Sequence, residues 1–186
     1  MRRRSFALAA LALVAAGCGS SPQPLPPVEA AVPQRAQLDW VESFGEPGAR
    51  VIFRVRSLEV LADGWRARIG LTNDTVASFS LGDRKASLDR TFGVMLFRTG
   101  DLRELEQRNS AGELPAIRRA RAYEPSLPLV LDPGTTWEGA ISARGSLAAG
   151  RYLRVVFGTL VPVGDAPPGL PDRIVWITDH AYRLRD

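Results

Sequence analysis

The sequence predicts an all-β fold, an antiparallel β-sandwich of about seven or eight strands with one short helix in a loop insertion. Two segments carry this prediction by alternating apolar and polar residues with the period of a strand. Residues 50–55 place Val51, Phe53 and Val55 on one face, and residues 65–71 place apolar side chains opposite two arginines. Half-buried strands of an antiparallel sheet have this pattern.

The remaining strands follow from apolar runs bounded by turn residues. Ala62-Asp63-Gly64 between the first two strands is typical of a hairpin, because glycine tolerates a positive φ. Turn-forming dipeptides and tripeptides also separate the later runs. Further strands are expected at residues 77–81, 92–98, 127–131, 135–143, 151–161 and 173–184. Long helices do not alternate with these strands, so a parallel sheet is not expected.

One helix is expected within the long loop at residues 99–125. Asp101 and Glu104 have the spacing of a capping box, with Asp101 as the N-cap. Leu102 and Leu105 give the helix a narrow apolar stripe, and the glycine at position 112 is expected to end it. We expect this loop to pass between the two sheets of the sandwich.

Three segments resemble immunoglobulin-like domains of bacterial surface lipoproteins. Residues 147–152, Leu-Ala-Ala-Gly-Arg-Tyr, stand before an apolar strand and resemble a tyrosine corner, in which the tyrosine hydroxyl bonds the chain upstream. Residues 72–74 and 131–135 resemble the turns of such modules. The resemblance covers residues 50–184 and implies an immunoglobulin-like antiparallel sandwich.

The cysteine pair of antibody domains is absent from this sequence, whose single cysteine is Cys18. The tryptophans Trp65, Trp137 and Trp176 therefore have no disulfide to pack against. We expect them to fill the core directly.

The first residues have the layout of a secretory signal. Arg2, Arg3 and Arg4 form a positive region, and an apolar run of 11 residues follows at positions 6–16. A membrane-spanning helix needs about 20 apolar residues, so this run is too short to be one. An ordinary signal peptide cut nearby would leave Cys18 as a free thiol.

The end of this run resembles the lipobox of bacterial lipoproteins, with Ala16 and Gly17 preceding Cys18. The sequence departs from the family at Ala15, where leucine is usual. The resemblance implies a signal peptide at residues 1–17 and lipid attachment at Cys18. It further implies an extracytoplasmic protein anchored in the cell membrane. The residue after the cysteine is glycine rather than an acid, which allows the outer membrane in a diderm organism.

Residues 18–37 are rich in proline, which fixes φ and removes donors, so we expect a disordered tether there and a folded domain at 38–186. The chain carries 24 basic and 20 acidic residues, a formal charge of +4. Removing the three arginines of the signal leaves 21 basic residues and a charge of +1. A nearly neutral domain does not indicate nucleic-acid binding.

The sequence offers little catalytic chemistry. His180 is the only histidine, no Gly-x-Ser-x-Gly segment supplies a nucleophile, and we expect no metal or other cofactor. Paired carboxylates remain an alternative, as does a calcium site at Asn73, Asp74 and Asp83. The acidic residues considered for paired chemistry are Asp74, Asp83, Asp89, Glu104, Glu106 and Glu113.

The densest basic cluster comprises Arg118, Arg119 and Arg121, with Tyr123 as a stacking surface. It could bind an envelope protein or an anionic polymer, or it could be a solvated face balanced by nearby glutamates. The leading hypothesis is a lipid-anchored, non-enzymatic binding module of the cell envelope. The alternatives are a carboxylate-based hydrolase or enzyme accessory, and a structural subunit of an envelope complex.

Overall fold

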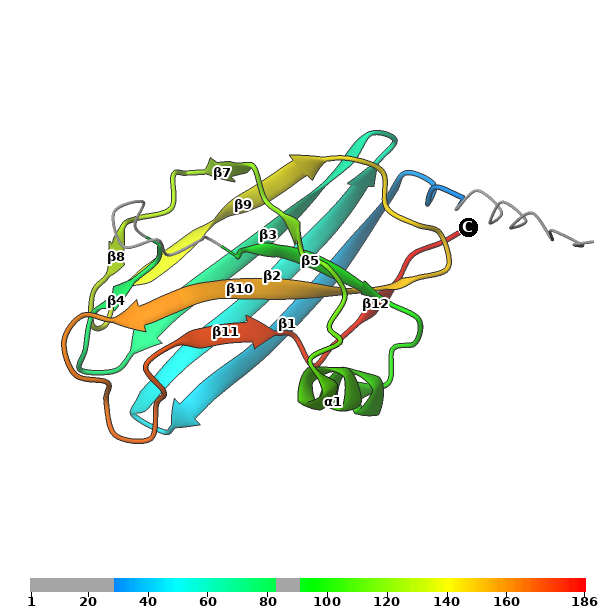
Figure 1. Ribbon diagram of the computed structural model, residues 1–186. Coiled ribbons are helices and arrows are strands. Elements are labelled where there is room, and N and C mark those ends of the chain that lie inside the picture. Colours follow the sequence, from blue (N-terminus) through cyan, green and yellow to red (C-terminus); the bar gives the residue numbers. More distant parts are fainter. Residues whose placement is uncertain (1–28, 83–90) are drawn as a thin grey trace, which may run out of the picture.

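The computed structural model describes residues 29–82 and 91–186, and its two antiparallel sheets face each other (Figure 1). This arrangement confirms the predicted all-β sandwich with one helix. The predicted signal peptide, Cys18 and the tether up to residue 28 lie outside the described residues, as do Asp83 and Asp89.

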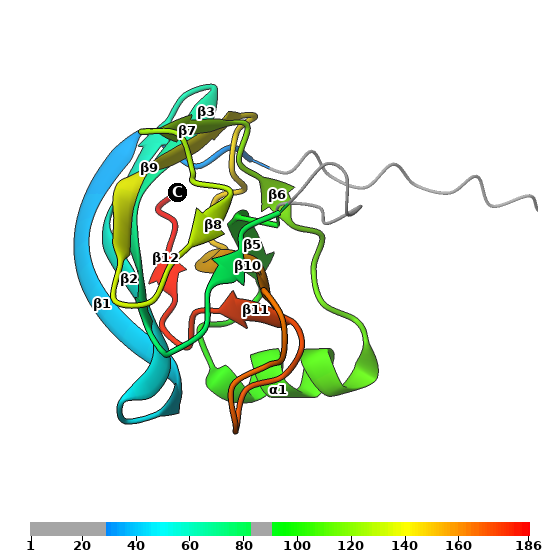
Figure 2. The same cartoon turned by 90° about the vertical axis from the view of Figure 1, so that its left-hand side faces the viewer.

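The first sheet has the order β1-β2-β3-β9-β7. Its strands are β1 (Gln34–Glu46), β2 (Ala49–Leu61), β3 (Gly64–Asp74), β9 (Thr136–Arg144) and β7 (Ala122–Glu124). The register pairs Leu61 with Gly64, which confirms the predicted hairpin. Three long neighbouring strands make this sheet the wide, curved layer seen edge-on in Figure 2.

The second sheet is centred on β10 and has the order β6-β5-β10-β4-β8. Its strands are β6 (Arg118–Arg119), β5 (Gly93–Phe97), β10 (Tyr152–Pro162), β4 (Phe79–Ser80) and β8 (Val130–Leu131). Two further strands, β11 (Ile174–Ile177) and β12 (Tyr182–Arg183), also pair with β10. The strand expected at residues 173–184 is therefore divided in two.

The core lies between the inward faces of the two sheets. Phe53 of β2 packs against Phe157 of β10, with ring centroids 5.2 Å apart, and both side chains are buried. Trp65 and Trp137 are buried, and the half-buried Trp176 stacks on Phe53 at 5.3 Å. The tryptophans thus contribute to the core as predicted, and burial of such apolar surface drives folding.

Strand β1 overturns the predicted boundary between tether and domain at residue 38. Gln34 is buried and pairs with Val60 of β2, so residues 34–37 belong to the sheet. Burial alternates with period two along this strand, through the register shift between Gln37 and Trp40, where Asp39 has a φ of 48°. The apolar signal in the sequence is weak because Glu42 occupies an inward position and Val41 an exposed one.

Helix α1 (Leu102–Ala111) begins and ends as the sequence predicts. The Asp101 carboxylate accepts a hydrogen bond from the Arg103 N–H, and Gly112 closes the helix at a φ of 70°. Leu105 packs against Met95, Phe97 and Val156, on the face of the second sheet turned away from the core. No helix in the described ranges is long and apolar enough to cross a membrane.

The loop that carries α1 connects the sheets as expected, because β6 joins β5 and β7 joins β9. Tyr152 does not form the predicted tyrosine corner. Its ring lies against Gly100 beside the helix, and its hydroxyl makes no hydrogen bond to the described residues. The side chain belongs to the outer apolar cluster because it alternates with the core residue Leu153 along β10.

Candidate functional site

The structure separates the predicted basic cluster between the two sheets. Arg118 and Arg119 lie on β6 in the second sheet, and the Arg118 guanidinium donates to the Ser146 carbonyl at 2.9 Å. Arg121 precedes β7 in the first sheet and lines an open hollow of about 630 Å³ with Arg144. The half-buried Tyr123 packs against the core and meets Phe92 edge-on at 6.2 Å.

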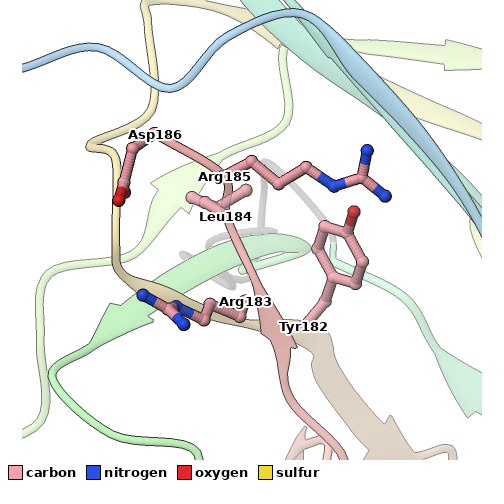
Figure 3. A pocket seen from close by; sticks show the side chains of 5 residues that line it. All are labelled: Tyr182, Arg183, Leu184, Arg185 and Asp186. Atoms are coloured by element: carbon pink, nitrogen blue, oxygen red, sulfur yellow. The ribbon is translucent and has the colours of Figure 1, made fainter.

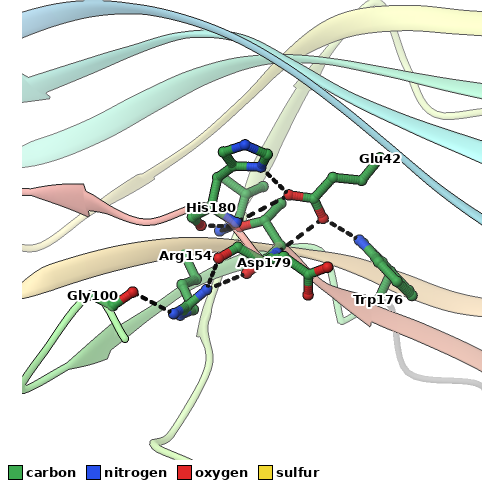
Figure 4. Close-up of polar contacts among 8 residues, drawn as sticks. Glu42, Gly100, Arg154, Trp176, Asp179 and His180 are labelled. Atoms are coloured by element: carbon green, nitrogen blue, oxygen red, sulfur yellow. Dashed lines mark hydrogen bonds and ion pairs between the residues drawn. The ribbon is translucent and has the colours of Figure 1, made fainter. Parts of the chain in front are cut away.

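A polar cluster that sequence reasoning missed lies where β1 meets the C-terminal segment (Figure 4). Glu42 occupies an inward position of β1, and its carboxylate is 7% exposed. It accepts hydrogen bonds from Trp176 Nε1 at 2.7 Å and from the backbone N–H groups of Asp179 and His180 at 3.0 and 3.1 Å. His180 Nδ1 lies 2.7 Å from the same carboxylate.

The Glu42 carboxylate favours the proton on His180 Nδ1 and holds the ring in one orientation. The ring also stacks on Trp40, with centroids 5.5 Å apart, and its side chain is 56% exposed. A general base needs such an orienting carboxylate, but it also needs a reacting partner. Within residues 29–82 and 91–186, no group of three His, Cys, Asp or Glu side chains is placed to hold a metal ion.

Asp179 lies next to Glu42 and His180, and their charges act on its carboxyl group. Burial raises the pKa of the Asp179 carboxyl, and repulsion from Glu42 raises it further. Attraction to Arg154 and His180 opposes this increase without cancelling it. The carboxylate form of Asp179 is therefore disfavoured in the folded protein.

Arg154 of β10 is fully buried and binds backbone carbonyls on both sides. Its Nη1 donates to the carbonyls of Thr178, at 2.8 Å, and Asp179. Its Nη2 donates to the carbonyls of Gly100 and Asp101 at 3.0 and 3.1 Å, while Nε has no acceptor among the described residues. Burial lowers the pKa of this guanidinium, although nearby carboxylates counteract the effect. The contacts join the start of α1 to the C-terminal segment.

Glu42 and Arg154 therefore hold one segment from two sides. Glu42 extends from the first sheet, Arg154 from the second, and residues 176–180 lie between them. The hydrogen bonds of both groups are directed mainly at the backbone, which is how a buried polar group fixes chain conformation. The geometry indicates a structural clamp.

A second hollow, of about 520 Å³, is formed by residues 182–186 at the C-terminal end (Figure 3). The side chains of Arg183, Arg185 and Asp186 point in different directions there. Gln34 closes this end of the domain, since its amide oxygen accepts from the Tyr182 hydroxyl and the Arg185 N–H, both at 3.1 Å.

Two of the acidic residues considered for catalysis or calcium, Asp74 and Glu104, have structural partners. Asp74 lies 3.7 Å from Arg50, and Glu104 binds Thr99 and Arg108. The Asn73 amide donates to the carbonyls of Ala77 and Leu131 and accepts from Thr75, so it closes a turn. The amide oxygen that would bind calcium is thus used within the chain.

Arginines cover the outer face of the first sheet, a feature that sequence reasoning did not identify as a site. The arginine face, as we call it, consists of Arg54 and Arg56 of β2 and Arg66 and Arg68 of β3. Most of these side chains bind a residue on another strand of the same sheet. In the sequence, this face is indicated by arginines two positions apart on two consecutive strands, at 54 and 56 and at 66 and 68.

No family model, curated protein or solved structure matches this chain.

Proposed function

We propose that this chain is a lipid-anchored, extracytoplasmic protein of the cell envelope that acts by non-covalent binding rather than catalysis. The proposed anchor is Cys18, on the strength of the lipobox resemblance. The observation that favours binding over catalysis is that the charged side chains of the polar cluster are already engaged in structural hydrogen bonds. Glu42 is occupied by four donors and Arg154 by four carbonyls, so both hold the fold together.

The position at which the N-terminal segment enters the domain supports a binding role for the first sheet. Ala30 bridges to Ala148, and the Ala31 N–H donates to the Leu147 carbonyl, so the chain enters beside the link between the sheets. Figure 2 shows this entry on the side opposite the outer face of the first sheet. A domain held through its N-terminus would leave the arginine face turned away from the point of attachment.

The anchor is tested by mass spectrometry of the full chain expressed in a diderm bacterium. Cleavage before Cys18, followed by trypsin, yields a peptide ending at Arg35, the first basic residue after the cysteine. We expect this peptide to carry a diacylglyceryl group on sulfur and an acyl group on nitrogen. The Cys18→Ser variant should retain residues 1–17. An unmodified thiol in the wild-type peptide would refute the anchor.

Binding is tested by photo-crosslinking in the same cells. A photoreactive residue at Gln37 or Ser142, on the outer face of the first sheet, should give discrete adducts with an envelope protein. The same group at Gln107, exposed on α1, serves as the matched position elsewhere. Absence of adducts at every position, together with turnover of a defined envelope substrate, would contradict a binding role.

A further inference from the structure

The arginine face is built from ion pairs that each pass over an intervening strand of the sheet. Arg56 lies 3.1 Å from Glu138 of β9, and Arg66 lies 2.6 Å from Glu124 of β7. Arg54 donates instead to the Thr72 hydroxyl at 2.8 Å. Nearly every arginine on this face is thus matched by an acceptor across the sheet.

Arg68 is the exception. Its side chain is exposed and makes no hydrogen bond or ion pair with the part of the chain that the structure describes. Its cross-strand neighbours are Ser57 of β2 and Ala140 of β9. Cross-strand partners directly opposite are the residues best placed to compensate a charge on a sheet. Neither serine nor alanine carries a compensating negative charge, so the guanidinium is open to a group from outside the chain.

A shallow hollow surrounds this guanidinium. Arg56, Arg66 and Arg68 line it together with Glu124 and Glu138, and its volume is about 200 Å³. Three arginines against two glutamates leave one positive charge in excess. Sites for whole small molecules usually measure about 300–1,000 Å³, so this hollow suits a single group of a larger partner.

We propose that this hollow receives one Asp or Glu side chain of a partner protein, with Arg68 as its principal contact. A planar carboxylate matches the planar guanidinium and can bind it through two parallel hydrogen bonds. The two flanking arginines already hold one carboxylate each, through a single hydrogen bond, so the incoming group completes a third pair. The proposal rests on the binding role proposed above and adds the chemistry of the partner.

The fixed acids beside Arg68 decide against a polyanion or an anionic membrane as the occupant. Glu124 and Glu138 line the same hollow, and their side chains are more than half exposed, at 67% and 54%. A regular array of phosphates would meet these carboxylates as well as the arginines, and like charges repel. A protein surface can place one acid opposite Arg68 and bases opposite the glutamates.

The test is an NMR titration of the processed protein, purified in non-ionic detergent. The probe is a synthetic peptide with alternating glutamate and threonine, compared with its glutamine counterpart. At low salt, the glutamate peptide should shift the amide signals of Ser57, Arg68 and Ala140 in a saturable way. Arg68→Gln should weaken binding at least fivefold. Arg144→Gln removes an exposed arginine of the neighbouring strand β9 and should leave the affinity unchanged.

Several outcomes would overturn the proposal. These are no saturable shift in the wild-type protein, equal binding by Arg68→Gln, equal loss in Arg144→Gln, or equal binding of the glutamine peptide. Inorganic phosphate or vesicles of anionic phospholipid producing the larger shift would also overturn it. If the crosslinked adducts persist in Arg68→Gln, the proposal for this site is refuted and the proposed binding function stands. If the wild-type protein gives no adducts at all, the proposed function itself is refuted.

Discussion

Glu104 at the start of α1 offers the sharpest test of the electrostatics. Its Oε2 accepts from the Thr99 N–H and hydroxyl, both at 2.8 Å, and its Oε1 accepts from Arg108 Nε at 2.9 Å. Burial raises the pKa of this carboxyl, but the hydrogen bonds from Thr99 and Arg108 outweigh it and lower the pKa from 4.5 to about 2. The side chain is 16% exposed, but its bonds to Thr99 lie at the protein surface, so solvent screening reduces the stability that they contribute.

The size of the effect follows from linkage between protonation and folding. At about 1.4 kcal/mol for each pH unit, the lowered pKa sets an upper limit of about 3 kcal/mol of stability at pH 7, which solvent screening reduces. Because the folded pKa lies below the unfolded value, this contribution is complete well above pH 4.5. It declines as the pH falls, with most of it lost by pH 3, and is exhausted below about pH 2.

The perturbation is Glu104→Gln, which keeps the shape of the side chain and removes its charge. We expect it to lower the free energy of unfolding by about 1–3 kcal/mol at pH 7, since glutamine retains one acceptor. Urea denaturation at pH 7, 5 and 3 measures the difference from wild type, which should shrink as the pH falls. Glu106→Gln on the same helix, an exposed side chain, is the matched control. A difference that stays constant from pH 7 to pH 3 would refute the reasoning.

The remaining predictions concern the clamp around the C-terminal segment. Glu42→Ala leaves the Trp176 indole and two backbone N–H groups without their acceptor, and should destabilise the protein by about 2–4 kcal/mol in urea denaturation; a loss below about 0.5 kcal/mol would contradict the clamp. Arg154→Ala leaves four carbonyls without their donor and should cost about 3–5 kcal/mol, with faster hydrogen exchange at residues 100–105 and 176–180 together; exchange that increases at only one of these segments would show that Arg154 does not join them. Asp179→Asn should raise the melting temperature at pH 7 but not at pH 3, because the raised pKa of this acid makes its ionised form unfavourable only above about pH 4; equal gains at both pH values would exclude this cause.

The strands and the helix were predictable where the signal is local. Alternation around Phe53 and Ile69 predicted β2 and β3, because side chains of a strand point to opposite faces whatever lies across the sheet. The caps of α1 were predictable because Asp101 and Gly112 act on backbone groups within one turn. Strand β1 was missed because Glu42 occupies an inward position and Val41 an exposed one, which weakens the apolar alternation on which the prediction depends.

The functional residues were harder to predict because their partners are distant in the sequence. Glu42 meets Trp176 and His180 across more than 130 positions, and residues that far apart meet only when strands from both sheets have closed the sandwich. The basic cluster looked continuous along the chain, yet Arg119 and Arg121 belong to different sheets. Proximity in the sequence says little about proximity in space once the chain crosses between layers.

The sequence by itself determined an all-β chain with its turns, its helix caps and an N-terminal region resembling a lipoprotein signal, because each of these is written in neighbouring residues. Only the tertiary structure decided that Arg154 would be buried among carbonyls and that Arg68 would have no acceptor in the described part of the chain. The physical reason is register. Which residues oppose Arg68 depends on how β2 and β9 align with β3, and that alignment is fixed by packing across the whole sheet.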